Sequence, residues 1–167
     1  MMLAEVHELF AYNAWANRRL FAAAAALPEE RYFRDLHSSH GGVHGTLAHI
    51  VWAEQLWLSR WGGTEAPSVA QGRDLPTLAA VQARWEDVER ARGALLAGVT
   101  VATLEERRAV RPSTGSEFQH TFREMFNHAI DHSSYHRGQV VTLLRQLGVQ
   151  PPSTGLIVFY REGRRVA

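Results

Sequence analysis

The chain has 167 residues, a length at which we expect one domain with a single core over residues 1–167. Its formal net charge is +1 and every basic residue is an arginine, which argues against a surface for nucleic acid or an anionic membrane. Cysteine is absent, which excludes disulfides, thiolate metal ligands and a cysteine nucleophile, and leaves nine histidines as the chemically distinctive residues.

The opening segment, MMLAEVHELFAYNAWANRRL, carries acidic and polar residues where a signal peptide needs an unbroken apolar core. No later run of apolar residues comes near the length of about 18 that a membrane-spanning helix needs. We therefore expect a cytoplasmic protein that has neither a membrane nor a nucleic acid as a partner.

Two helices are predicted in the first third of the chain from apolar residues at steps of three and four. The first covers residues from about 2 to 26 and ends before Pro28. The second covers residues from about 41 to 61, after the polar segment HSSHGGVHG. Its apolar face comprises Leu47, Ile50, Val51, Leu58 and Trp61.

A third helix is predicted after the Gly, Pro and Ser-rich segment 62–73, with Asp74 as its cap and Pro76 in its first turn. Its apolar stripe is interrupted at Arg92 and consists of Leu78, Val81, Trp85, Val88, Leu95 and Val99. The sequence TLEE, residues 103–106, has the capping-box pattern and predicts one short extra turn.

The segment RRAVRPSTGSEFQHTF brackets a turn with short alternating stretches, which favours a small hairpin. Helical spacing returns from about 119 to 147 and stops at Gly148. The short apolar tail LIVFYRE is expected to pack back on the body. Together these elements predict an all-α fold, a four-helix bundle with a long crossover and a short hairpin before the last helix.

The last long helix carries histidines four residues apart, as the pairs His128–His132 and His132–His136. Four residues advance about 400° and roughly 6 Å on a helix, so each pair shares one face with metal-chelating spacing. A catalytic zinc ion usually takes three protein ligands, and His49, inside the second helix, is the candidate third. Spacing alone leaves open which pair binds a metal, and a hydrogen-bonded core histidine at position 49 is the alternative.

The segments YNAWANRRL, HGTLAHIVWAEQLWLSRW, NHAIDHSSYHRGQVVTLLRQLG and PPSTGLIVFYRE resemble, in order and spacing, the DinB-like family of damage-inducible proteins. The resemblance covers nearly the whole chain and implies a three-histidine site for a divalent metal ion, usually zinc or nickel. Carried over by motif, the ligands are His49, His132 and His136, and His128 lies outside this set.

The resemblance also implies a type of reaction, because related members of the superfamily are low-molecular-weight-thiol transferases or thiol-dependent isomerases. It favours a metal-dependent enzyme in which a thiol cosubstrate attacks a small electrophilic substrate, with Tyr135 or His128 as a proton relay. A metal-assisted hydrolase is one alternative, and a non-enzymatic, stress-responsive metal-binding dimer is another. The resemblance further implies a homodimer.

Other polar residues have simpler interpretations at this point. His37, His40 and His44 crowd the glycine-containing entry to the second helix and are expected to face water, with a second, adventitious metal site there as the alternative. Arg137 is expected to form an ion pair on the surface or between subunits. Glu54 lies roughly 140° round the helix from His49 and is poorly aimed as a further metal ligand.

Overall fold

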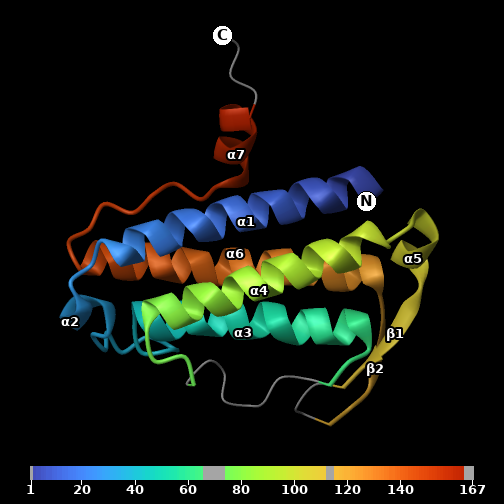
Figure 1. Ribbon diagram of the computed structural model, residues 1–167, viewed down its shortest axis with the longest axis horizontal. Helices are drawn as coiled ribbons and strands as arrows, with labels where there is room; N and C mark the ends of the chain where they lie inside the picture. The colour runs from blue at the N-terminus through green and yellow to red at the C-terminus, as the bar shows by residue number, and fades with distance from the viewer. Residues whose placement is uncertain (1, 66–73, 112–114, 164–167) are drawn as a thin grey trace.

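A computed structural model, drawn in Figure 1, describes residues 2–65, 74–111 and 115–163. Its four long helices are α1 (Leu3–Ala25), α3 (Val43–Gly62), α4 (Leu78–Ala97) and α6 (Phe122–Gln146). Helices α1 and α3 each pack against both α4 and α6. In Figure 1 α3 and α4 run in the same direction, which requires a long crossover between them. The predicted all-α bundle with a long crossover is therefore confirmed.

The smaller elements are α2 (Glu29–Tyr32), α5 (Val101–Glu105), β1 (Arg107–Val110), β2 (Phe118–Thr121) and α7 (Leu156–Gly163). Most of them lie at the ends of the bundle, and α7 lies beside the middle of α1 (Figure 1). Strands β1 and β2 form the predicted hairpin, antiparallel, with Arg107 opposite Thr121. Helix α6 begins three residues later than predicted because residues up to Thr121 belong to the strand.

The starts of two helices differ from the sequence prediction because a threonine caps each of them. Thr77, rather than Asp74, caps α4, and its hydroxyl accepts the backbone N–H of Ala80 at 3.1 Å. Thr100 caps α5 in the same way, through the backbone N–H of Thr103 at 3.2 Å, so this helix starts before the TLEE segment. A capping side chain accepts the backbone N–H two or three residues further along, and Thr77 and Thr100 stand in that position at the starts of α4 and α5.

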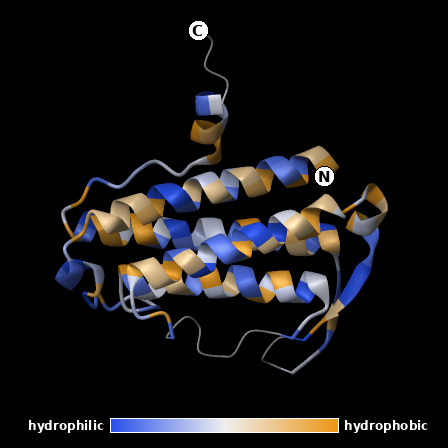
Figure 2. Ribbon diagram, in the orientation of Figure 1, coloured by the Kyte–Doolittle hydropathy of each residue, from blue (hydrophilic) through white to orange (hydrophobic). Residues whose placement is uncertain are grey.

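Two apolar clusters fill the bundle. One, towards the α2 end, includes Leu20, Val51, Trp85 and Leu144. The other, towards the hairpin, contains the rings of Phe10, Trp61 and Phe126, whose centroids lie 4.8 to 5.7 Å apart in edge-on contacts. Figure 2 shows hydrophilic residues along the middle of the long helices, between these two regions.

A buried polar layer centred on Glu54 of α3 separates the two clusters. Its carboxylate accepts hydrogen bonds from Asn13 at 2.7 Å and Asn17 at 3.0 Å, both on α1, and from Ser133 of α6 at 2.9 Å. Arg92 of α4 donates to the other carboxylate oxygen at 3.0 Å, and both charged side chains are 3% exposed. All four long helices therefore contribute to one polar centre.

Arg137 joins this layer, and its predicted position in an ion pair at the surface or between subunits is wrong. The residue is 1% exposed, and its guanidinium donates to the side-chain oxygens of Asn13 and Asn17 and to Ser134. Because Arg137 follows Ser133 by four residues, the two side chains share the face of α6 that points into the bundle.

The C-terminal segment packs on the body, as predicted. Leu156 and Phe159 lie against the apolar cluster near the hairpin, and the hydroxyl of Tyr12 donates to the carbonyl of Thr154 at 3.0 Å. Figure 1 shows α7 standing out from α1 beyond this contact. Among the helices that the structure describes, none is long and apolar enough to span a membrane.

Replacing Glu54 by Gln removes the fully buried counter-charge of Arg92, which keeps only the partly exposed Glu89 as a carboxylate partner. The expected loss is about 3–5 kcal/mol in the free energy of unfolding, the cost of breaking a buried ion pair from one side. Chemical denaturation measures it. The matched control is Glu86→Gln on the exposed side of α4, for which the change should stay within about 0.5 kcal/mol. Equal losses of stability in the two variants would contradict the conclusion that the buried carboxylate of Glu54 stabilises the fold.

Acid should weaken the fold through the same carboxyl group. Burial by itself raises the pKa of Glu54, but the charge of Arg92 and the hydrogen bonds from Asn13, Arg92 and Ser133 outweigh it and leave the pKa lowered. The resulting stabilisation is complete above the unfolded-state pKa of about 4.3 and is lost as the pH falls through the lower folded-state value. Below about pH 4, denaturation should therefore show a steeper loss of stability for the wild type than for Glu54→Gln. Parallel curves would refute this.

Candidate metal centre

Helices α3 and α6 bring the three predicted ligands next to one another. Facing α6, His49 of α3 lies 4.5 Å from His136 and 5.3 Å from His132, measured between ring centroids. The rings of His132 and His136, one turn apart on α6, lie 4.4 Å from each other. The helical spacing that suggested a metal site thus corresponds to a cluster of imidazoles at the α3–α6 contact.

A fourth histidine, His40, enters the cluster from the loop before α3. Its ring stacks on His49 with centroids 3.9 Å apart and planes at 16°, and lies 5.2 Å from His136. Among the described residues, His40, His49 and His136 are the group whose possible metal-binding atoms all lie within 4.8 Å of one another. The expectation that His40 faces water is therefore wrong, because the loop folds back over the start of α3.

The other two histidines near the entry to α3 lie outside the cluster. The side chain of His37 is 92% exposed, as expected. His44 is half-buried instead, and its Nδ1 lies 2.9 Å from the hydroxyl of Tyr32 in a hydrogen bond. Glu54, which the sequence indicated to be poorly aimed at the site, points into the polar layer.

Burial keeps the imidazoles of His49 and His132 neutral. It lowers the pKa of His49 to about 3, with further lowering by the neighbouring His40, His136 and His132. Burial and then the adjacent His136 and His128 lower the pKa of His132 to about 4. At pH 7 both rings are therefore uncharged, which is the protonation state that binds a metal ion.

The donor chemistry of the cluster fits a divalent cation. Nδ1 of His49 is buried and has no hydrogen-bond partner among the described residues, a costly state for a polar atom. A cation bound to this nitrogen would give its lone pair a partner. Nδ1 of His136 lies 2.8 Å from the side-chain oxygen of Gln139, which accepts its hydrogen and leaves the lone pair on Nε2.

Gln139 is a functional candidate that the sequence reasoning missed. It orients the ring of His136 in the way that outer hydrogen-bond partners orient metal-binding histidines. The available signal was its position three residues after His136, where helical side chains are neighbours. A solvent-exposed residue with no role could stand at the same position, so the spacing alone did not identify Gln139 as functional.

Two cavities are lined by sequence or ring neighbours of the cluster, although none of its four histidines is among the described residues that line them. The larger, about 610 Å³, lies towards the hairpin and is lined by Trp57, Arg60, Val110, Phe118, His120, Glu124, Met125 and His128. The smaller, about 530 Å³, lies between α6 and the loop that carries His40, and its lining includes Tyr135, Gly138 and Gln139. Both volumes fall in the range of small-molecule sites.

The two predicted proton carriers each line one of these cavities. His128 forms part of the larger one, with its ring 4.8 Å from Trp57 and 5.8 Å from His132. Tyr135 lines the smaller one, is 66% exposed, and has its ring 5.1 Å from that of His136.

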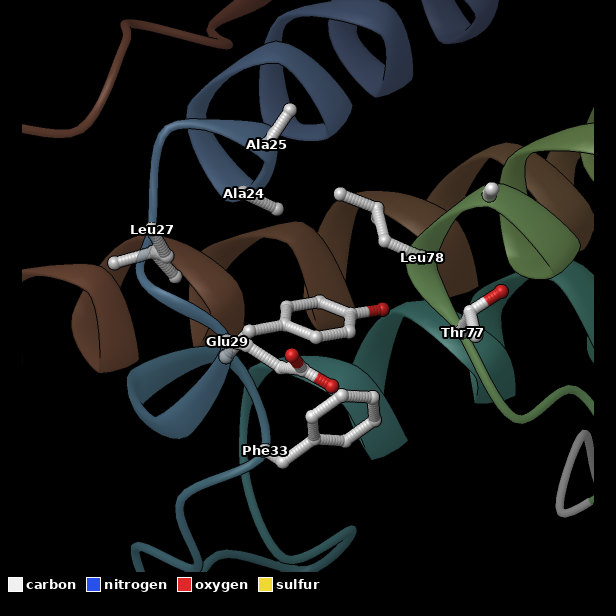
Figure 3. Close-up of a pocket in the computed structure, with 9 residues that line it drawn as sticks. Ala24, Ala25, Leu27, Glu29, Phe33, Thr77 and Leu78 are labelled. Atoms are coloured by element: carbon white, nitrogen blue, oxygen red, sulfur yellow. The ribbon is translucent and has the colours of Figure 1, made fainter.

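A third cavity, of about 320 Å³, is unrelated to the histidines. It lies between the end of α1, the short helix α2 and the start of α4 (Figure 3). Its wall is mostly apolar, with Glu29 and Thr77 as polar members and no histidine. The cavities beside the imidazole cluster are therefore the better candidates for a substrate.

Comparison with known proteins agrees with this arrangement of helices and histidines. The chain matches the DinB family over residues 2–163, a span that includes all four long helices and the whole imidazole cluster. Protein DinB of Bacillus subtilis (strain 168) is 26% identical over 164 residues, which cover 91% of this chain and 92% of that protein. The chain therefore belongs to the DinB family.

Proposed function

We propose that this protein is a metal-dependent enzyme that transfers a low-molecular-weight thiol to an electrophilic small molecule. The main observation in support is the cluster of imidazoles at the α3–α6 contact, in which His49, His132 and His136 are the proposed ligands. Imidazole donors suit zinc and nickel. When bound, such an ion supplies a Lewis acid that lowers the pKa of a thiol or a water molecule beside it.

The larger cavity supports a thiol that carries a carboxylate. Arg60 lines it, with its guanidinium carbon 4.5 Å from the ring centroid of Trp57, and offers a positive charge to an anionic group. Glu124 lines it too, but its carboxylate accepts the backbone N–H of Thr121 at 2.8 Å at the start of α6. Because the chain has no cysteine, the attacking sulfur must come from such a cosubstrate.

His128 is the proposed proton acceptor. Burial lowers its pKa, against the raising effect of Asp131, so the ring is neutral at pH 7. It lies between the larger cavity and His132, where it can accept the proton that a thiol releases before attack. Tyr135, beside His136, is the corresponding candidate on the other cavity.

The first experiment measures metal content. Untagged protein purified at about pH 7.5 is expected to hold about one zinc or nickel ion per chain by plasma mass spectrometry. The triple variant, in which His49, His132 and His136 are all replaced by Ala, should hold none, because its donors are gone. A wild type that binds no metal even after reconstitution would refute the proposed mechanism.

The same preparations test the reaction. With glutathione and 1-chloro-2,4-dinitrobenzene, a carbon–sulfur bond forms, chloride leaves and the thiol proton is released. Metal-loaded wild type should accelerate this conjugation, and the triple variant should not. Metal binding without acceleration of any thiol tried, including cysteine, would favour the non-enzymatic alternative.

Gln139→Leu tests the orientation of His136. The substitution keeps the size of the side chain but removes the oxygen that accepts the Nδ1 hydrogen. Zinc affinity, measured by competition with a chromophoric chelator, is expected to fall by about 10- to 100-fold. The control is Gln146→Leu, near the end of the same helix and away from the cluster, which should leave the affinity unchanged. A wild-type affinity in Gln139→Leu would show that this hydrogen bond does not matter.

A further inference from the structure

His40 lies next to the imidazoles of His49 on α3 and His136 on α6. It stacks on His49 and its donor atom lies within 4.8 Å of those of His49 and His136. It comes from a loop, whereas the other members of the cluster come from helices. Stacking on His49 by itself brings the donor atoms of these two residues close, but the donor distance to His136 requires that the ring of His40 also lie over α6.

Glycines hold the His40 loop tightly against α3. A Cβ at Gly45, one turn before His49, would lie 1.9 Å from the carbonyl oxygen of His40, so only glycine permits this approach. A Cβ at Gly42 would lie 2.2 Å from the carbonyl oxygen of Arg34. The backbone N–H of Gly42 also donates to the carbonyl of His40 at 3.0 Å. The position of His40 over the cluster is therefore built into the backbone.

The ring of His40 is ready to act as a donor. It is half-buried, and burial together with the neighbouring His136 lowers its pKa, so that it is neutral at pH 7. Neutral imidazole is the form that coordinates zinc or nickel.

We propose that His40 is a fourth histidine ligand of the metal ion, delivered by the loop before α3. The proposal rests on the proposed function, since it needs a metal at His49 and His136. Zinc in proteins takes four ligands at closed sites and keeps one position open at catalytic sites. His40 would therefore occupy the position that a substrate needs, and its loop would control access to the metal.

The test compares metal-depleted, untagged full-length variants. Zinc affinity, measured by competition with a chelator, should fall in His40→Ala. Loss of a hydrogen-bond partner of a ligand costs about 10- to 100-fold in affinity, and loss of a ligand should cost at least as much. The visible absorption of the cobalt(II)-loaded protein, which reports the number and arrangement of donors, should also change. Gly45→Ala keeps every imidazole but displaces the loop, and it should change both readouts in the same direction.

The control is His37→Asn in the same loop. This side chain is exposed, and asparagine tolerates the positive φ of 54° at that position, so affinity and cobalt spectrum should match the wild type. Far-UV circular dichroism establishes that each variant is folded. Wild-type affinity and spectrum in His40→Ala would overturn the proposal while leaving the proposed function intact. A wild type that binds no metal would overturn both.

Discussion

The buried carboxylate of Glu54 is the interaction on which the rest of the structure depends. An ionised carboxylate in the core is tolerable only when charge and hydrogen bonds compensate its desolvation, and here each of the other three long helices supplies part of that compensation. The compensation is directional, unlike the apolar packing on either side. Glu54 therefore fixes how far each helix may slide or rotate relative to its neighbours.

The imidazole cluster takes its geometry from this polar layer. His132 immediately precedes Ser133, and His136 immediately precedes Arg137, so the residues that point inward set where the adjacent histidines lie on α6. On α3, Glu54 follows His49 by five residues and anchors the same helix. A helix rotation that misplaced the histidines would also break hydrogen bonds in the layer. Positioning the donors in this way uses rigid helices and leaves the two cavities to adapt to a substrate.

The cluster combines rigid donors with one donor on a loop. Three of its histidines lie on long helices, whereas His40 is held by close backbone contacts that Gly45 makes possible. Burial lowers the pKa of His49 and of His132 and keeps these two rings neutral, and neutral ligands would leave the charge of a bound cation uncompensated. That charge is the property a thiol-activating or water-activating site requires.

The sequence by itself determined the helices, the hairpin and the shared helix face of His128, His132 and His136, because these follow from local spacing of residues along one chain. The position of His49 inside the second helix made it the candidate third ligand, and the DinB resemblance selected the pair His132 and His136 to go with it. Only the tertiary structure decided the roles of Arg92 and Arg137, which spacing could describe only as an interruption and a surface charge. It likewise decided the place of His40, which depends on a loop closing over α3. The physical reason is that periodicity reports which face of a helix is buried, whereas a buried charge and a loop-borne imidazole are defined by partners distant in sequence.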